Sequence, residues 1–166
     1  PHIQTDPRNL LRVGAALVQR LAEIDPAHAA AYQARWQDFS VRWETAIARW
    51  QQQAAPLKGM PVVVQHKSFS YLIAWLGLRE VATLEPKPGV EPSLGHLADI
   101  AARLKTTPAK AVLRATYQSP RASEWLAERA NIPAVALPFT VGGAAGTDDL
   151  FGLFDVTLAE LLKVPR

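Results

Sequence analysis

Four short apolar runs, separated by helical segments, constrain the fold of this chain more than any other feature. The runs cover residues 61–64, 80–85, 111–115 and 134–138, and turn residues bound each of them. The spacing predicts helices over 68–76, 93–105, 120–130 and about 148–163. Alternation of strands and helices with short connections predicts an α/β fold with a four-stranded parallel sheet, flanked by helices on both faces.

Two helices are expected ahead of the sheet. Asp6 can cap the first helix and Pro7 suits its first position, and Asp25 and Pro26 repeat this pair where the second helix should begin. The second helix, roughly residues 26–54, would be a long backbone helix of about 40 Å at about 1.5 Å per residue. Its aromatic and apolar residues recur on one side, which is typical of packing rather than of cofactor stacking. They are Tyr32, Trp36, Phe39, Trp43, Ile47 and Trp50.

Composition narrows the class of protein. With 166 residues, of which 49% are hydrophobic and 20% charged, the chain can bury a core of its own. The net charge of +3 comes from scattered Lys and Arg without a basic run, so we expect no nucleic-acid partner. Cysteine is absent, which excludes disulfides and thiolate ligands. The chain starts with Pro1 and shows no leader, so we expect any targeting segment to lie outside it.

Motifs of the common enzyme classes are missing. The sequence contains no nucleophile elbow, phosphate-binding loop, dinucleotide fingerprint or pair of zinc-protease histidines. The glycine-rich stretch 142–146 follows the last apolar run and lacks the lysine of a phosphate loop. We therefore expect a protein that is not an enzyme.

Two of the four histidines are candidates for a binding site. His66 follows the first predicted strand, and open parallel sheets bind ligands outside the carboxyl ends of their strands. Imidazole is a common ligand for zinc and also serves manganese and iron, but His66 and His2 need further partners. His28 is expected to be a solvated surface residue, and His96 to lie at a helix edge or to support a site near that helix start.

Several segments together resemble one family. They are PHIQTDPRN, LAEIDPAHAAAYQAR, ALPFTVGG and the long stretch from PLKGMPVVVQHKSFSY to EPSLGHLADI. In their order and spacing they resemble the periplasmic solute-binding proteins of metal-ion ABC importers, the zinc and manganese group. The resemblance covers the whole chain, but only the C-terminal part of a family member. It implies a two-lobed protein in which a long helix joins the lobes and the metal lies between them.

The resemblance also implies a division of the chain and a set of metal ligands. Residues 1–24 would belong with an N-terminal lobe, 25–55 would form the inter-lobe helix, and 56–166 would form the C-terminal α/β lobe. His2 and His66 match two ligand histidines of the family, and a third histidine would come from the other lobe. Val141 stands where many members carry a carboxylate. Either Asp148 or Asp149 replaces that acid, or water completes a site of three histidines, which favours Zn²⁺ over the alternative Mn²⁺.

The function implied is capture of zinc in the periplasm and delivery to the membrane permease of an ABC transporter. Two alternatives remain open. One is a flavodoxin-like domain that binds a phosphorylated ligand through loops 85–93 and 139–149, and the other is a metal-independent adhesin or interaction module of the same fold. The apolar stripe of residues 1–24 would be exposed without a covering lobe, so a homodimer is a further expectation.

Overall fold

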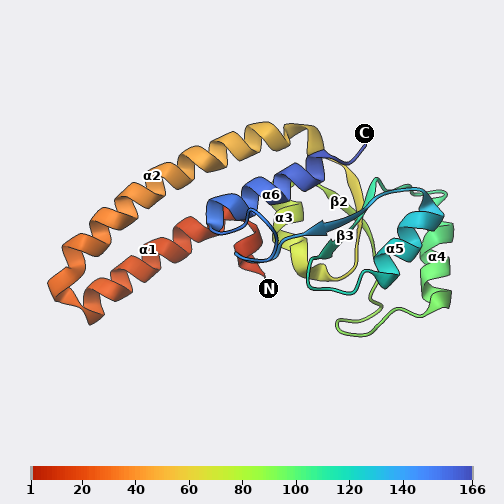
Figure 1. The fold of residues 1–166 in the computed structure, drawn as a ribbon, viewed down its shortest axis with the longest axis horizontal. Coiled ribbons are helices and arrows are strands. Elements are labelled where there is room, and N and C mark those ends of the chain that lie inside the picture. Colours follow the sequence, from red (N-terminus) through yellow and green to blue (C-terminus); the bar gives the residue numbers. More distant parts are fainter. Residues whose placement is uncertain (1, 166) are drawn as a thin grey trace.

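The computed structural model describes residues 2–165 and shows an α/β lobe from which a long helical hairpin projects (Figure 1). Helix α1 (Pro7–Ile24) and helix α2 (Ala29–Ala54) pack along each other and form the hairpin. Short 3-10 helices precede α1 (Ile3–Thr5), join the two long helices (Pro26–His28) and follow α2 (Ala55–Leu57). In the described part of the chain, no helix is both long and apolar enough to cross a membrane.

The start of the hairpin follows the sequence prediction closely. The Asp6 side chain accepts a hydrogen bond from the backbone N–H of Arg8, and Pro7 occupies the first turn of α1. The second helix differs slightly, because residues 26–28 form a 3-10 turn and the α-helix begins at Ala29. At this turn the Asp25 carboxylate binds His28 and Tyr32, which ties the start of α2 to the end of α1.

All four strands are parallel and lie in the order β2-β1-β3-β4. Their bounds are Pro61–Val64 for β1, Arg79–Thr83 for β2, Ala111–Ala115 for β3 and Ala134–Leu137 for β4. Backbone pairing continues past β2, since Leu84 donates to Val64 and Glu85 donates to Gln65. The carboxyl ends of β1 and β2 therefore stay side by side as far as Glu85.

Helices cover both faces of the sheet. Helices α2, α3 (Ser70–Leu76) and α6 (Leu150–Leu162) share one core with Val62 and Val64, together with the 3-10 helix Lys67–Phe69. Helices α4 (Leu94–Leu104) and α5 (Arg121–Ala130) form a second core with Val63. Successive side chains of a strand point to opposite faces, so a strand buried on both sides reads as a continuous apolar run. The predicted α/β fold with a four-stranded parallel sheet is confirmed.

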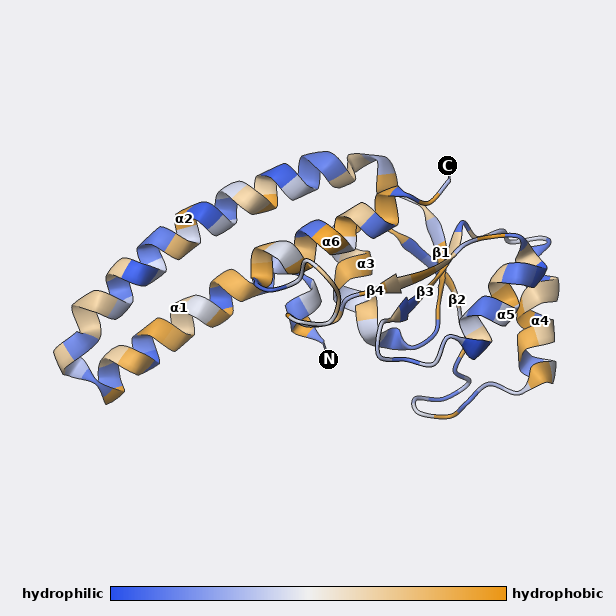
Figure 2. Ribbon diagram, in the orientation of Figure 1, coloured by the Kyte–Doolittle hydropathy of each residue, from blue (hydrophilic) through white to orange (hydrophobic). Residues whose placement is uncertain are grey.

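The aromatic stripe of α2 is buried only where α2 meets the lobe. Trp43 and Trp50 are fully buried, and both contact Phe154 of α6. The ring centroids of Trp43 and Trp50 lie 5.0 Å from each other. Tyr32 and Trp36, nearer the tip of the hairpin, are only half-buried. The outer part of α2 is largely hydrophilic, whereas hydrophobic residues lie at the lobe and also along α1 (Figure 2). The stripe is thus a packing surface, as its spacing predicts.

Candidate metal site

His66 lies at the carboxyl edge of the sheet, where its position depends on two neighbouring strands. Gln65 donates its backbone N–H to Leu113 over 2.8 Å and accepts one from Glu85 over 3.0 Å, which extends the sheet just past β1. The next residue, His66, has a partly buried side chain, which places an imidazole at the edge where parallel sheets bind ligands.

The His66 ring is held by Glu85. His66 Nδ1 lies 2.6 Å from Glu85 Oε2, and the two side chains are 25% and 16% exposed. A carboxylate accepts hydrogen bonds, so this contact places the proton on Nδ1 and leaves the lone pair of Nε2 available to a metal ion. The second apolar run of the sequence ends at Glu85, but the sequence alone did not predict that Glu85 pairs with His66. The sequence shows that each residue follows a strand, but only the strand order shows that β1 and β2 are neighbours.

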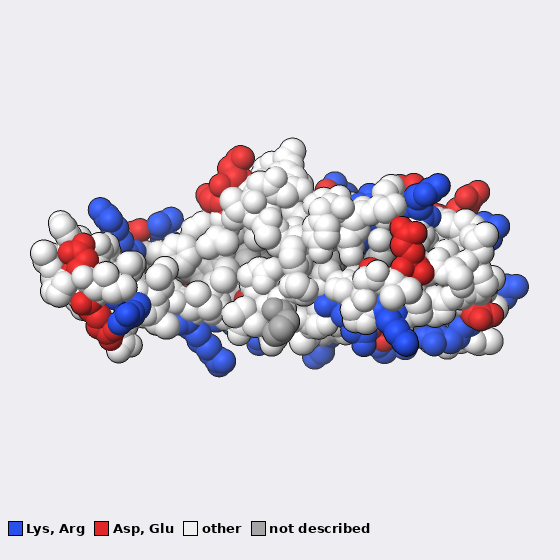
Figure 3. Space-filling view, turned by 90° about the horizontal axis from the view of Figure 1, so that it is seen from below, with Lys and Arg blue, Asp and Glu red and all other residues white. Residues whose placement is uncertain are grey.

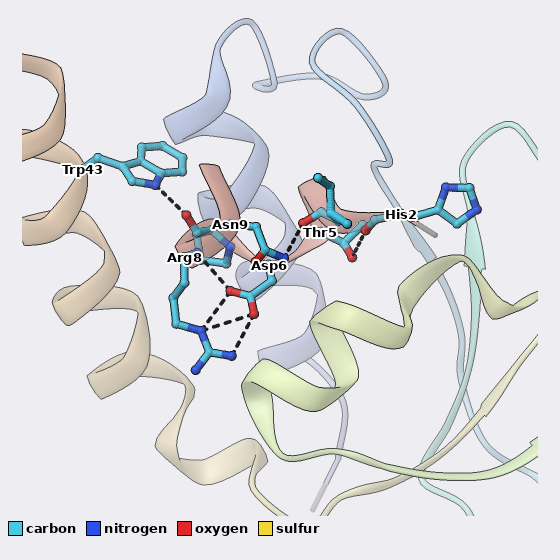
Figure 4. A network of polar contacts seen from close by, with 8 residues as sticks. His2, Thr5, Asp6, Arg8, Asn9 and Trp43 are labelled. Atoms are coloured by element: carbon cyan, nitrogen blue, oxygen red, sulfur yellow. Dashed lines mark hydrogen bonds and ion pairs between the residues drawn. The ribbon is translucent and has the colours of Figure 1, made fainter. Parts of the chain in front are cut away.

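His2 is carried by a short segment with its own hydrogen bonds. The Thr5 hydroxyl and backbone N–H donate to the His2 carbonyl over 2.9 Å and 3.2 Å. The Asn9 side-chain amide donates to the Ile3 carbonyl over 3.0 Å. Figure 4 shows the His2 ring pointing away from this network. The backbone of the segment is therefore fixed, while the imidazole stays available.

This segment is fastened to α2 and internally braced. Trp43 Nε1 donates to the Pro7 carbonyl over 2.8 Å, which links the start of α1 to the buried part of α2. Asp6 is buried and binds the Arg8 guanidinium, with Nη2 to Oδ2 at 2.7 Å (Figure 4). The hydrogen bond to Asp6 raises the pKa of Arg8, so Arg8 remains charged. The sequence predicts the Asp6 cap, but no pattern in it predicts the Trp43 contact.

The fold brings His2 and His66 together, although 64 positions separate them in the sequence. Their ring centroids lie 6.5 Å apart, and Phe139, which follows β4, packs its ring on His2 at 4.9 Å. Two imidazoles that share one zinc ion lie roughly 5–6 Å apart, given zinc–nitrogen bonds of about 2.0–2.1 Å. The observed centroid separation is slightly larger, so the two rings would have to approach each other to share one ion.

The two candidate acidic ligands, Asp148 and Asp149, are not grouped with the two histidines. Asp148 and Asp149 are exposed, and Asp149 caps α6 by accepting a hydrogen bond from Gly152 N–H over 2.8 Å. Val141 is also exposed and offers no ligand atom. Within residues 2–165, no three or more His, Cys, Asp or Glu side chains form a group able to hold a metal. The structure therefore supplies a pair of histidines, and the two aspartates remain predictions.

The other two histidines lie outside this pair. His28 is exposed and its Nδ1 lies 2.8 Å from Asp25 Oδ2, as expected for a surface residue. His96 lies in the first turn of α4, and its Nε2 is buried without a hydrogen-bond partner in the described residues. His96, His66 and Glu85 line one cavity of about 500 Å³, so α4 begins beside the candidate site.

A family model and curated relatives match this chain. Residues 1–164 match the family model described as ZnuA, zinc-uptake complex component A, periplasmic. A curated relative is the high-affinity zinc uptake system protein ZnuA of Brucella abortus, 22% identical over 120 residues, which cover 72% of this chain and 36% of that protein. The chain thus spans about a third of the length of this relative.

Solved structures share the fold. A crystal structure of ZnuA superimposes with a TM-score of 0.84 at 23% identity, covering 100% of this chain and 60% of that chain. The solute-binding protein FpvC of Pseudomonas aeruginosa, in complex with Mn²⁺, superimposes with a TM-score of 0.78 at 19% identity, covering 98% and 63%. Because the family model matches nearly the whole sequence, the chain belongs to the ZnuA family of periplasmic zinc-uptake components.

Proposed function

We propose that this protein captures a divalent metal ion, zinc rather than manganese, in the periplasm and delivers it to the membrane permease of an ABC transporter. The observation that carries the proposal is the pair of imidazoles of His2 and His66 at the carboxyl edge of the sheet, whose ring centroids lie 6.5 Å apart. Binding and release suffice for this function, so no catalytic step is proposed.

The donor atoms favour zinc. Two neutral imidazole nitrogens suit the tetrahedral nitrogen and sulfur sites of zinc, whereas manganese prefers carboxylate, carbonyl and water oxygens. The nearest acid, Glu85, already binds His66 and Gly89. The name of the Brucella relative also indicates zinc, whereas FpvC was solved with Mn²⁺, so Mn²⁺ is the alternative.

We propose that the remaining ligands come from water, from Asp148 or Asp149, or from a further lobe of the protein. In this proposal residues 1–24 pack on that lobe, residues 25–55 link the two lobes, and residues 56–166 form the C-terminal lobe. Two features support it. Val13 and Leu17 of α1 are exposed, and a nearly uncharged stretch lies between two charged ends on the face nearest the N-terminus (Figure 3).

The test is a calorimetric zinc titration of the full-length protein and three variants. His66→Ala and His2→Ala remove one proposed ligand each and should each weaken zinc binding by at least tenfold. His28→Ala is the matched control, because His28 is exposed and, within residues 2–165, its side chain contacts Asp25 and the neighbouring Tyr32 ring. Unchanged zinc binding in both ligand variants would refute His2 and His66 as ligands. No zinc binding by the wild type would refute metal capture and favour the metal-independent interaction module.

A further inference from the structure

We propose that Glu85 is a positioning residue for metal capture, because one carboxylate fixes both the orientation of the His66 imidazole and the position of the loop 86–92. The inference rests on the proposed function, since it assigns a role beside the histidine that would bind the metal. Glu85 contacts His66, the proposed metal ligand, and does not itself need to contact the metal ion.

The contact between the two side chains is short and partly buried. His66 Nδ1 and Glu85 Oε2 are 2.6 Å apart, slightly shorter than the distance of about 2.7–2.9 Å usual for hydrogen bonds from nitrogen to a carboxylate. Because Glu85 also donates its backbone N–H to Gln65, its carboxylate starts from a fixed point one residue from His66. The ring can then neither rotate freely nor move its proton to Nε2 without losing the bond. Histidine ligands of metals are commonly held in this way by carboxylates.

The same oxygen atom holds the loop. Gly89 donates its backbone N–H to Glu85 Oε2 over 2.9 Å. Gly89 has φ +78°, a left-handed conformation that other residues rarely adopt, and it turns the loop back toward the strand end. Within the loop, the Val90 backbone N–H donates to the Lys87 carbonyl, which does not reach the sheet. Glu85 is therefore the link between the loop and the edge of the sheet.

Because Glu85 binds both His66 and Gly89, it couples the loop 86–92 to the His66 imidazole. A metal ion on Nε2 withdraws electron density from the ring, which makes Nδ1–H a better donor and strengthens the bond to Glu85. The loop also lines the cavity that contains His66, through Pro86, Lys87 and Pro88. Metal binding should thus make the loop 86–92 more ordered. A substitution of Glu85 should disturb both the orientation of the His66 imidazole and the position of this loop.

The first experiment examines the metal-free protein and therefore does not depend on zinc binding. Long-range ¹H–¹⁵N NMR spectra report which ring nitrogen of His66 carries the proton, and His66→Ala identifies the signals. We expect the Nδ1–H tautomer in the wild type and in Glu85→Gln, whose amide oxygen can still accept the bond. Glu85→Ala should shift the population toward the Nε2–H tautomer. The same tautomer in all three proteins would overturn the proposal.

The second experiment measures zinc affinity of the same proteins. Glu85→Ala should weaken binding by about 10–100-fold, the range usual for removal of such partners, and Glu85→Gln by less. Glu91→Ala is the matched control. Glu91 follows Glu85 by six residues and lines a second cavity together with it, but it makes no hydrogen bond to His66 within the described residues. Equal losses in both Glu85 variants, with an unchanged tautomer, would make Glu85 a metal ligand and refute the positioning role.

The two experiments separate the inference from the proposed function. If the wild type fails to bind zinc while the tautomer shifts in Glu85→Ala, the proposed function fails and the orientation by Glu85 stands. If zinc binds tightly to the wild type and equally to Glu85→Ala, the proposed function stands and the positioning role fails.

Discussion

The helical hairpin has two ends that differ sharply in their surroundings. At the lobe, Trp43 and Trp50 are 0% exposed, whereas Leu17 and Ile24 toward the tip are 54% and 64% exposed. Apolar residues recur with helical spacing at both ends, so the spacing alone does not decide burial. Burial depends on whether another element packs there. Helix α6 covers the lobe end, and no described element covers the outer face of α1 at the tip.

This difference matters for the candidate site. The segment that carries His2 joins α1 at the lobe end, where Trp43 binds the Pro7 carbonyl. The imidazole is therefore attached to the well-packed end of the hairpin. Substitutions at the lobe end should therefore have larger effects than substitutions at the tip.

Trp43→Ala should destabilise the protein most. The change removes a fully buried ring that packs on Phe151 at 4.9 Å and leaves the Pro7 carbonyl without its donor. Replacing a buried aromatic residue by alanine costs about 3–5 kcal/mol of the free energy of unfolding. Urea denaturation measures this loss. Trp43→Phe, which keeps most of the ring, should cost far less, and a similar loss in both variants would contradict the packing account.

Asp155→Ala should have the next largest effect. Asp155 of α6 accepts hydrogen bonds from Trp50 Nε1 over 2.6 Å and from Arg49 over 2.9 Å, which joins α2 to α6. Leaving the indole N–H of buried Trp50 without an acceptor should cost about 1–3 kcal/mol. The control is Asp38→Ala, which breaks an exposed pair with Arg42 and should cost less than about 0.5 kcal/mol. Equal denaturation midpoints for the two variants would oppose this ranking.

At the tip, Asp25 should contribute a small pH-dependent stability. Hydrogen bonds from Tyr32 and then from His28 lower the pKa of Asp25, and the bond to Asp25 raises the pKa of Tyr32. A carboxylate with a depressed pKa in the folded state stabilises the protein above its unfolded pKa of about 3.9. That contribution is lost as the pH falls through the folded pKa. Asp25→Asn should thus be less stable than the wild type at pH 6, and the difference should vanish well below pH 4.

Leu17→Ser should change the stability of the monomer least, by less than about 0.5 kcal/mol, because the side chain is already exposed. The same variant tests whether the outer face of α1 joins two copies of this chain. Light scattering of the 166-residue chain should show a mass that rises with concentration, and the rise should be weaker in Leu17→Ser. A mass that is monomeric at every concentration would remove the homodimer.

Most of the fold could be predicted from the sequence. The four buried strands produce continuous apolar runs because helices cover both faces, and Asp6, Ser93 and Asp149 provide the side chains that cap α1, α4 and α6. Strand ends were less certain. Strand β2 ends at Thr83 rather than at residue 85, although its pairing continues to Glu85.

The site was predictable only in part. The position of His66 follows from its place after β1, and His2 was found through the family resemblance. The contact between Trp43 and Pro7 attaches the segment of His2 to α2; it joins positions 36 residues apart and leaves no pattern in the sequence. The pairing of His66 with Glu85 likewise required the strand order, which places β1 next to β2. Long-range contacts of single side chains are what sequence spacing does not specify.

The most direct test of the metal site is a crystal structure of the zinc-loaded full-length protein, with data collected on both sides of the zinc absorption edge. We predict one anomalous peak at about 2.0–2.1 Å from Nε2 of His66 and bound also by the His2 imidazole. Glu85 should remain on Nδ1 of His66. A fully occupied zinc peak that lies elsewhere and contacts neither histidine would contradict the account.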